Sequence, residues 1–370
     1  MTTQHIETLI IGAGQAGLST GSALRRAGRP FLIVDRGDRL GDNWRRHYDS
    51  LRLYTPAKYD GLPGLPFPAA DPWSFPGKDD VAAYLEQYAV HWDLPVRMKT
   101  GVDRLTARPG GGYLAHIGAD VIGCDNVVVA TGTFGRAPRI PEFATDLDPA
   151  ITQLHSSRYR GPDQLTGGPV LVVGASHSGT DIAYELARTH PTTLCGRDCG
   201  QVPLRWDSRA IKVALPVLVF LWRHVLTRRT PMGRKEMRQI RFHGGPMLRV
   251  KRADLAERGV ERITQRVRGV RDGKPELDDG TVLDVRNIVW ATGFRQIFDW
   301  IELPVFDADG WPREYRGVVE DAPGLFFCGL SFQYAFSSMV FPGVGRDAGY
   351  LARRIVARAP APASSGAVAA

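Results

Sequence analysis

The chain has 370 residues, 43% of them hydrophobic, which suits a globular protein of two or three domains. Its longest apolar run, residues 213–222, is interrupted by Pro216 and falls short of the roughly 20 residues that a membrane-spanning helix needs. The formal net charge is +8, and the four scattered cysteines form no CxxC pair, which argues against a dithiol redox centre and a zinc site.

The first expected structure is a strand, a glycine turn and a helix within residues 7–36. The apolar run 8–11 precedes a GxGxxG turn from Gly12 to Gly17, and a second apolar run, 31–34, ends in Asp35, 23 residues after Gly12. The first glycine permits a tight turn, the second lets a pyrophosphate approach the backbone, and the third lets helix and strand pack closely. Asp35 is placed to bind a ribose 2′-hydroxyl, so this stretch predicts a dinucleotide site.

The middle of the chain alternates irregular and regular segments. Proline-rich residues 36–76 predict a long functional loop. A helix is expected at 79–92, with strands at 95–99, 102–107 and 113–117. A buried strand then ends in Ala130-Thr131-Gly132, and turn-rich residues 141–168 follow.

The opening pattern returns at residues 170–197, offset by 162. Gly12 falls on Gly174, Gly14 on Ser176 and Gly17 on Gly179, while Asp35 falls on Arg197. An arginine at this position accommodates a 2′-phosphate, which a carboxylate would repel. The sequence therefore predicts two dinucleotide sites of opposite charge preference.

The second unit also repeats the end of the first. Ala291-Thr292-Gly293 echoes the Ala-Thr-Gly of the first unit at the end of another buried strand. A strand at 325–328, Gly329, an apolar loop at 332–341 and a closing helix follow. The low-complexity residues 359–370 are expected to be disordered.

Positive charge is concentrated between residues 205 and 252, which hold 13 Lys or Arg and two acids. Such a region suits nucleic acid, anionic lipid, a phosphorylated cofactor or an acidic substrate, and equally a solvated arginine-rich face. No nucleic-acid-binding motif accompanies it, so no nucleic-acid partner is predicted. The polar residues 1–5 run directly into the first strand, from which we expect a cytoplasmic protein with reduced thiols.

Taken together, these motifs resemble the flavin-containing monooxygenases, two-dinucleotide-binding-domain flavoproteins, over residues 6–357. The likeness is greatest to YUCCA-type auxin-forming monooxygenases and their bacterial relatives. It is carried by Trp44, Tyr48, Leu51 and Leu53, by the LPGLPFP run at 62–68, by HSSRY at 155–159 and by GVGRDA at 343–348. We interpret His155, in the third motif, as a structural linker residue rather than as a catalytic acid or base.

The resemblance implies an α/β fold of two Rossmann-like dinucleotide-binding domains, with the NADPH domain (166–290) inserted into the FAD domain (1–165 plus 291–358). Asp35 would bind the adenosine ribose of FAD, Trp44 would lie near the flavin ring, and Arg197 would bind the 2′-phosphate of NADPH. The implied cofactor-binding residues are Gly12, Gly14, Gln15, Ala16, Gly17, Asp35, Arg36, Trp44, Val102, Ala130, Thr131, Gly132, Gly174, Ser176, Ser178, Gly179, Arg197, Ala291, Thr292, Gly293 and Gly329.

The activity implied is that of an NADPH-consuming FAD monooxygenase. It would form a C4a-(hydro)peroxyflavin and transfer one atom of molecular oxygen to a small organic substrate, apolar or aromatic. The cofactor carries the chemistry, so no catalytic residue and no metal is predicted. Residues 213–222 and the loop 332–341 are candidates for the substrate pocket, the loop with core packing as its alternative. A flavoprotein reductase or oxidase without oxygenation and a non-catalytic flavoprotein regulator remain as alternatives, and the oligomeric state is left open.

Overall fold

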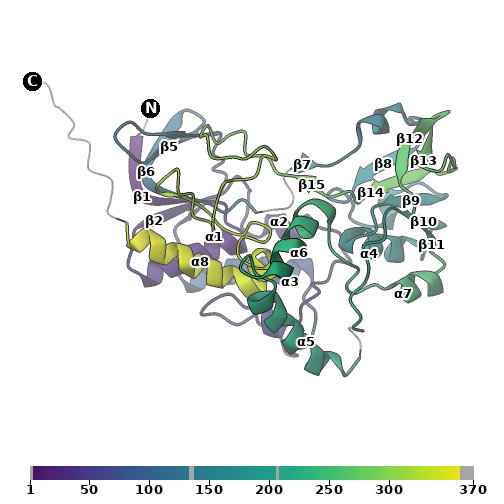
Figure 1. Ribbon diagram of the computed structural model, residues 1–370, viewed down its shortest axis with the longest axis horizontal. Coiled ribbons are helices and arrows are strands. Elements are labelled where there is room, and N and C mark those ends of the chain that lie inside the picture. The colour runs from purple at the N-terminus through teal and green to yellow at the C-terminus, as the bar shows by residue number, and fades with distance from the viewer. Residues whose placement is uncertain (1–2, 133–136, 206–207, 359–370) are drawn as a thin grey trace, which may run out of the picture.

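The computed structural model describes residues 3–132, 137–205 and 208–358. They form two α/β units that lie side by side, each built on its own sheet (Figure 1). The first sheet has seven strands in the order β3-β2-β1-β6-β5-β4, with β16 also paired to β6. The second sheet has five strands in the order β11-β10-β9-β14-β8, and all of its pairings are parallel.

The strands of the first sheet are β1 (Thr3–Ile11), β2 (Phe31–Val34), β3 (Val96–Arg97), β4 (Arg104–Ala107), β5 (Tyr113–Ile117), β6 (Asp120–Val129) and β16 (Leu325–Phe327). Those of the second are β8 (Thr152–His155), β9 (Val170–Val173), β10 (Thr192–Cys195), β11 (Glu261–Ile263) and β14 (Asn287–Trp290). Two short antiparallel pairs complete the strands, namely β12 (Val267–Arg271) with β13 (Lys274–Leu277), and β7 (Ala137–Pro138) with β15 (Phe294–Arg295).

The α-helices are α1 (Gln15–Arg26), α2 (Asp42–Arg45), α3 (Lys78–His91), α4 (His177–Leu186), α5 (Ile211–Phe220), α6 (Pro231–His243), α7 (Arg252–Glu257) and α8 (Phe341–Val356). A turn of π-helix, Leu221–Val225, continues α5. The helix predicted at 79–92 is therefore confirmed within one residue at each end. The strand predicted at 95–99 is shorter than expected. Every helix in the described ranges is too short or too polar to cross a bilayer.

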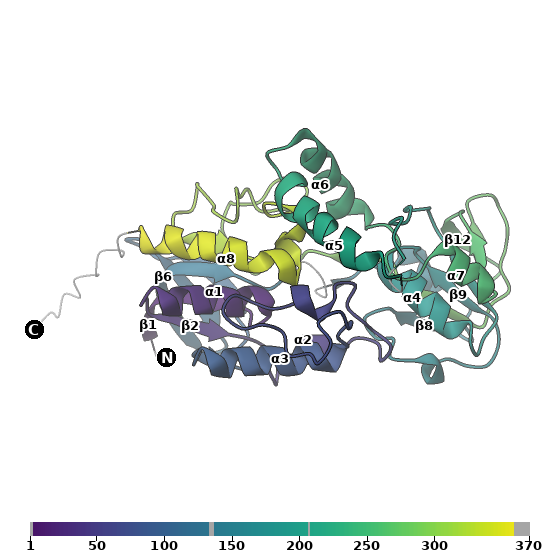
Figure 2. The same ribbon diagram turned by 90° about the horizontal axis from the view of Figure 1, so that it is seen from below.

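Alternate residues of each buried strand supply two cores, because successive side chains point to opposite faces of a sheet. In the first unit, Ile10 and Val128 pack on one face against α1, α3 and α8, which form one helical layer (Figure 2). Leu9 and Val127 face the other way, toward the chain that follows β15. The second unit repeats this arrangement, with Val172 facing α4 and Leu171 facing the opposite core.

The second unit is inserted between β6 and β16, two paired strands of the first sheet. The chain crosses to the second unit through β7 and returns through β15, which pairs antiparallel with β7. Strand β8 is hydrogen-bonded to β14 in the second sheet, although the expected boundary at residue 166 assigns it to the first unit. Residues 359–370, expected to be disordered, lie outside the described residues.

Candidate functional site

The first glycine turn connects β1 to α1 and has the geometry that its sequence predicts. Gly12 has φ +113°, and a Cβ on it would lie 2.5 Å from the carbonyl oxygen of Ala130. A Cβ on Gly17 would lie 1.8 Å from the carbonyl oxygen of Gly12, so this glycine lets α1 pack on the turn. A Cβ on Gly14 would have nothing within 4 Å. Gly14 therefore leaves a bare backbone position open to a ligand.

The second glycine turn, between β9 and α4, repeats these contacts. Gly174 has φ +110°, and a Cβ on it would lie 2.4 Å from the carbonyl oxygen of Ala291. A Cβ on Gly179 would lie 1.7 Å from the carbonyl oxygen of Gly174. Ser176 replaces the second glycine, and its Oγ donates a hydrogen bond to the carbonyl of Gly245 at 2.8 Å. The serine side chain is thus drawn toward the segment after α6.

Asp35 follows β2 and lies beside the first glycine turn. Its Oδ2 accepts a hydrogen bond from the backbone N–H of Ala13 and its Oδ1 one from Gly37, both at 2.7 Å. These bonds fix the carboxylate between the turn and the following loop, where Thr100 N–H also bonds to the Asp35 carbonyl. A carboxylate accepts several hydrogen bonds, so it keeps capacity for a ribose hydroxyl.

The counterpart of Asp35 in the second unit differs by one residue from the sequence overlay. Gly12 N–H bonds to the carbonyl of Val34, the last residue of β2, whereas Gly174 N–H bonds to the carbonyl of Cys195, the last residue of β10. Gly196, with φ +119°, therefore takes the place of Asp35, and Arg197 follows it. The acid is replaced by a bare backbone, and a guanidinium lies at the next position.

Each Ala-Thr-Gly segment links the end of a central strand to the crossing between the units. Gly132 and Gly293 have φ +78° and +80°, and a Cβ on either would have nothing within 4 Å. His155, the last residue of β8, contacts the second of these segments: its Nε2 lies 3.0 Å from the Gly293 carbonyl oxygen, and its Nδ1 lies 2.9 Å from Ser157 Oγ. The ring is buried, in agreement with the structural role expected for it.

Both glycine turns open onto one cavity of about 1160 Å³ between the units. This volume exceeds the range usual for a single small ligand. Gly17 and Gly179 do not line it, since they lie where helix and turn pack. The other predicted cofactor-binding residues all line it, namely Gly12, Gly14, Gln15, Ala16, Asp35, Arg36, Trp44, Val102, Ala130, Thr131, Gly132, Gly174, Ser176, Ser178, Arg197, Ala291, Thr292, Gly293 and Gly329.

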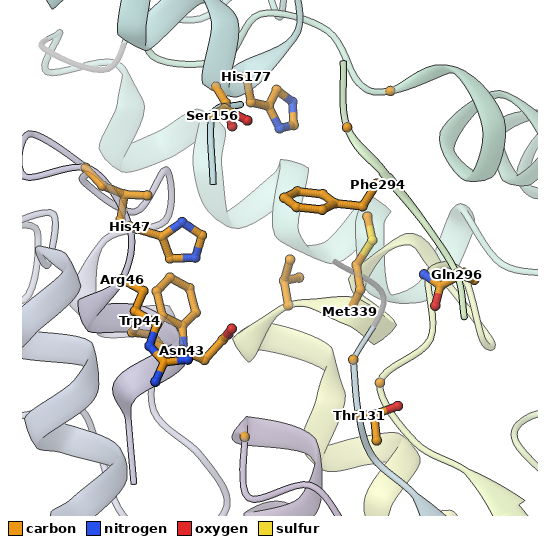
Figure 3. A pocket seen from close by; sticks show the side chains of 18 of the residues that line it. Asn43, Trp44, Arg46, His47, Thr131, Ser156, His177, Phe294, Gln296 and Met339 are labelled. Carbon is orange, nitrogen blue, oxygen red and sulfur yellow. The ribbon is translucent and has the colours of Figure 1, made fainter. Parts of the chain in front are cut away.

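Aromatic and thioether side chains surround the centre of the cavity. Figure 3 shows Trp44 and His47 on one side and Phe294 and Met339 on the other. The buried Nε1 of Trp44 makes no hydrogen bond to any described residue. A buried donor without a partner is costly, so a ligand acceptor at this point would relieve it. Together with the bare Gly14 backbone, this donor makes the cavity fit a large polar cofactor with a planar ring.

The cavity is also lined by His47 and Phe294, which the sequence did not predict, and by His177, which it placed at the second glycine turn without a chemical role. His47 and His177 both line the cavity, His177 beside Ser156 and His47 above Trp44 (Figure 3). Burial lowers the pKa of each imidazole to about 4, assisted at His47 by Arg160 and Lys78. Both rings are therefore neutral at pH 7. His177 lies inside the second glycine turn, between Ser176 and Ser178, so the motif offered a signal for its place but no chemical role. No local pattern distinguishes His47, whereas Phe294 follows Gly293 directly and the Ala-Thr-Gly repeat offered a signal for it.

Arg241 of α6 is a largely buried cation at the wall of the cavity, its side chain 9% exposed. Its Nη2 lies 3.5 Å from Oε1 of the buried Glu314, which also pairs with Arg228 at 2.7 Å. Its guanidinium stacks over Trp311 at 4.4 Å, and its Nε donates to the Ser331 carbonyl. Burial lowers the pKa of Arg241 to about 10, which leaves it charged at neutral pH. Two guanidiniums share one carboxylate, so the cluster keeps an excess positive charge.

The two candidate substrate-pocket segments have different outcomes. In the loop 332–341, Phe336, Met339 and Val340 line the cavity, while Phe332 is fully buried in the core behind it. The expectation for residues 213–222 is wrong, because no described residue of α5 lines the cavity. The inner face of α5 instead packs behind Phe336 and Leu248.

The described residues contain no group of three His, Cys, Asp or Glu side chains arranged to hold a metal ion.

A family model described as pyridine nucleotide-disulphide oxidoreductase matches residues 9–201, more than half of the chain. The chain belongs to this family. An uncharacterized CzcO-like oxidoreductase of Geobacillus kaustophilus is 36% identical over 364 residues, which covers 95% of this chain and 99% of the relative.

Other relatives of this oxidoreductase family are named as monooxygenases. Indole-3-pyruvate monooxygenase YUCCA1 of rice (Oryza sativa) is 28% identical over 342 residues, with 84% of each chain covered. Among solved structures, a mutant flavin monooxygenase from Stenotrophomonas maltophilia is 26% identical, with a TM-score of 0.78, and the match covers 96% of this chain and 99% of that one. These likenesses confirm the predicted fold class and the resemblance to flavin monooxygenases.

Proposed function

We propose that this protein is an FAD-dependent, NADPH-consuming monooxygenase that transfers one oxygen atom to a small organic substrate. The observation that carries the proposal is that two glycine turns with the same close backbone contacts face one cavity, with the carboxylate of Asp35 at the first and the guanidinium of Arg197, one residue further along, at the second. The monooxygenase names of the YUCCA1 relative and of the Stenotrophomonas maltophilia structure support the reaction class.

The charges at the two turns support the assignment of the cofactors. FAD has a free adenosine ribose, which Asp35 is placed to bind, and its pyrophosphate would lie over the bare backbone at Gly14. NADPH carries a 2′-phosphate, which suits Arg197 beside the acid-free Gly196. The first unit would therefore hold FAD and the inserted unit NADPH.

The bound flavin supplies hydride acceptance and oxygen activation, and the protein residues supply geometry and exclusion of water. Trp44 and Phe294 flank the centre of the cavity and would confine a planar ring there. The neutral His47 and His177 add no charge near it. The substrate would take the apolar end formed by Phe336, Met339 and nearby side chains, with Arg241 as the cation at its wall. We therefore expect an apolar or aromatic substrate.

Small molecules and oxygen are the partners that this function requires. The cysteines Cys124, Cys195, Cys199 and Cys328 are all unpaired thiols in the structure. Free thiols are usual in reducing compartments, which supports a cytoplasmic location.

The test is a stepwise assay of the FAD-loaded protein. Anaerobic NADPH should bleach the flavin absorbance, and aerobic turnover with a panel of apolar and aromatic substrates should yield a product heavier by one oxygen atom. Labelled oxygen gas should supply that atom. NADPH oxidation that yields only hydrogen peroxide with every substrate would instead indicate a reductase or oxidase. A flavin that NADPH cannot bleach would indicate a non-catalytic regulator.

A further inference from the structure

Helix α5 and the π-turn after it carry apolar side chains on two opposite faces. Ile211, Leu215, Val219 and Trp222 are buried in a core with Phe336 and Leu248. Val213, Val217, Phe220 and Leu221 face solvent, with exposed fractions of 76%, 58%, 57% and 38%. These four positions recur at helical spacing and form one stripe, which we call the α5 stripe.

Among the residues that the structure describes, the α5 stripe is the main concentration of exposed large apolar side chains. Of the nine large hydrophobic residues exposed in the described part of the chain, the four of the stripe and Met232 lie within residues 213–232. Figure 1 shows α5 at the lower edge of the molecule and Figure 2 shows α6 at its upper edge, so neither helix lies between the two sheets. Contiguous exposed apolar surface usually marks an interaction site.

Many cations and few acids lie in and around the segment that carries the stripe. Residues 208–250 contain ten Lys or Arg and a single acid, Glu236. The exposed cations are Arg209, Lys212, Arg223, Arg229, Arg234, Lys235 and Arg238. None of these seven forms an ion pair with a carboxylate among the residues that the structure describes. Helical spacing places Lys212 and Arg223 along one edge of the α5 stripe.

We infer that the α5 stripe and its border of cations form a docking surface for an anionic lipid bilayer. An apolar helix face that enters the acyl boundary, flanked by Lys and Arg at headgroup level, is the arrangement of interfacial helices. The long stems of Lys and Arg let their charged ends reach the phosphates while the stripe is immersed. The surface thus matches both layers of a membrane interface.

The combination of charge and apolar surface argues against two other partners, a second copy of this chain and a nucleic acid. A symmetric dimer through this face would bring each cation near those of its partner, which is repulsive. Nucleic acid would match the cations, but its phosphate surface offers nothing to the exposed Phe220 and Leu221. An anionic bilayer is the partner that satisfies the apolar stripe and the cations together.

The helical segment that carries the docking surface also packs behind the cavity between the two units. Trp222, on the inner side of the same helical segment, contacts Phe336 with ring centroids 5.1 Å apart, and Phe336 lines the cavity. A bilayer at the α5 stripe would therefore be separated from the apolar end of the cavity by this helical segment and by the side chains of Trp222 and Phe336. This consequence rests on the proposed function, whereas the docking itself does not.

The test is flotation of the FAD-loaded protein with phosphatidylcholine vesicles, with and without phosphatidylglycerol. Binding should require phosphatidylglycerol and weaken with salt. Lys212→Gln/Arg223→Gln should lower the partition constant about fivefold per cation, and Val217→Ser/Phe220→Ser should lower it at least about tenfold. Matched controls are Val90→Ser on α3, where Val90 is 80% exposed, and Arg353→Gln/Arg354→Gln on α8. Both controls should bind as the wild type does.

Three outcomes would overturn the inference. The first is an absence of wild-type binding to anionic vesicles, and the second is an equal loss in the control and α5 variants. The third is a dimer in sedimentation velocity that Val217→Ser/Phe220→Ser dissociates while no vesicle is bound, which would make the face a subunit interface. Vesicle binding needs no turnover, so its failure is distinguishable from failure of the proposed reaction.

Discussion

A methyl group added to Gly14 should weaken ligand binding, whereas one added to Gly17 should weaken protein packing, although both glycines belong to the same turn. In Gly14→Ala the new Cβ meets nothing within 4 Å, and φ at this residue is −77°, which alanine adopts freely. The free energy of unfolding of the apoprotein should fall by no more than about 1 kcal/mol, the usual scale of a change at a helix N-cap. The methyl group would project toward the pyrophosphate, so FAD affinity should fall at least about tenfold.

In Gly17→Ala the new Cβ would lie 1.8 Å from the Gly12 carbonyl oxygen, so α1 must move away from the turn. Such overpacking should cost about 3 kcal/mol or more in apoprotein stability. The assay is chemical denaturation of both apoproteins, monitored by circular dichroism, with FAD titration of each by fluorescence quenching. A Gly14→Ala protein that binds FAD as tightly as the wild type would refute the reasoning, as would a Gly17→Ala apoprotein of unchanged stability.

Three further changes probe other parts of the site. Arg197→Ala removes a charge-assisted phosphate contact, so KM for NADPH should rise roughly tenfold to a hundredfold. KM for NADH and the FAD content of the protein should stay unchanged. An equal loss of NADPH and FAD binding would contradict the assignment of the two sites. Asp60 is fully buried and accepts a bond from Thr55, and burial raises its pKa to about 8. The unfolded chain loses this proton near pH 4 and the folded one near pH 8, so stability should fall as pH rises between these values. Asp60→Asn should flatten that decline in thermal unfolding scans, and an unaltered decline would exclude Asp60 as its source. Tyr48 Oη donates a hydrogen bond to Oδ2 of Asp181 at 3.3 Å. Tyr48→Phe should therefore destabilise the protein by about 1 kcal/mol, measured as a lower unfolding temperature. An unchanged unfolding temperature would mean that this bond contributes nothing to stability.

Local features of the fold and site were predictable because their causes lie within a few residues. The glycine turns follow from the close approach of Gly12 to Ala130 and of Gly174 to Ala291, which excludes a side chain at each first glycine. The repeat in sequence therefore predicted a repeat in structure. The fit of Asp35 to the turn followed from the same spacing.

Features set by pairing between distant segments were not predictable. Arg197 was overlaid on Asp35 by counting from the glycine, but hydrogen bonds between β9 and β10 fix the register one residue differently. The exposed stripe of α5 was interpreted as a pocket wall, because an apolar run does not reveal which of its faces meets the core. The joint pairing of Arg228 and Arg241 with Glu314 depends on residues far apart in the chain.

The insertion of one unit between β6 and β16 also fixes the order in which the protein can be completed during synthesis. The core of the first unit joins Ile10 and Leu18 to Val344 and Leu351 of the closing helix. A nascent chain therefore holds an unfinished first unit, with part of its core uncovered, throughout translation of the whole second unit. Domains made first usually fold first, but here the second unit can close its sheet with β14 before the first receives β16 and α8. Termination of translation between β14 and β16 would therefore release a chain whose second unit has all the strands of its sheet and whose first unit lacks β16 and α8.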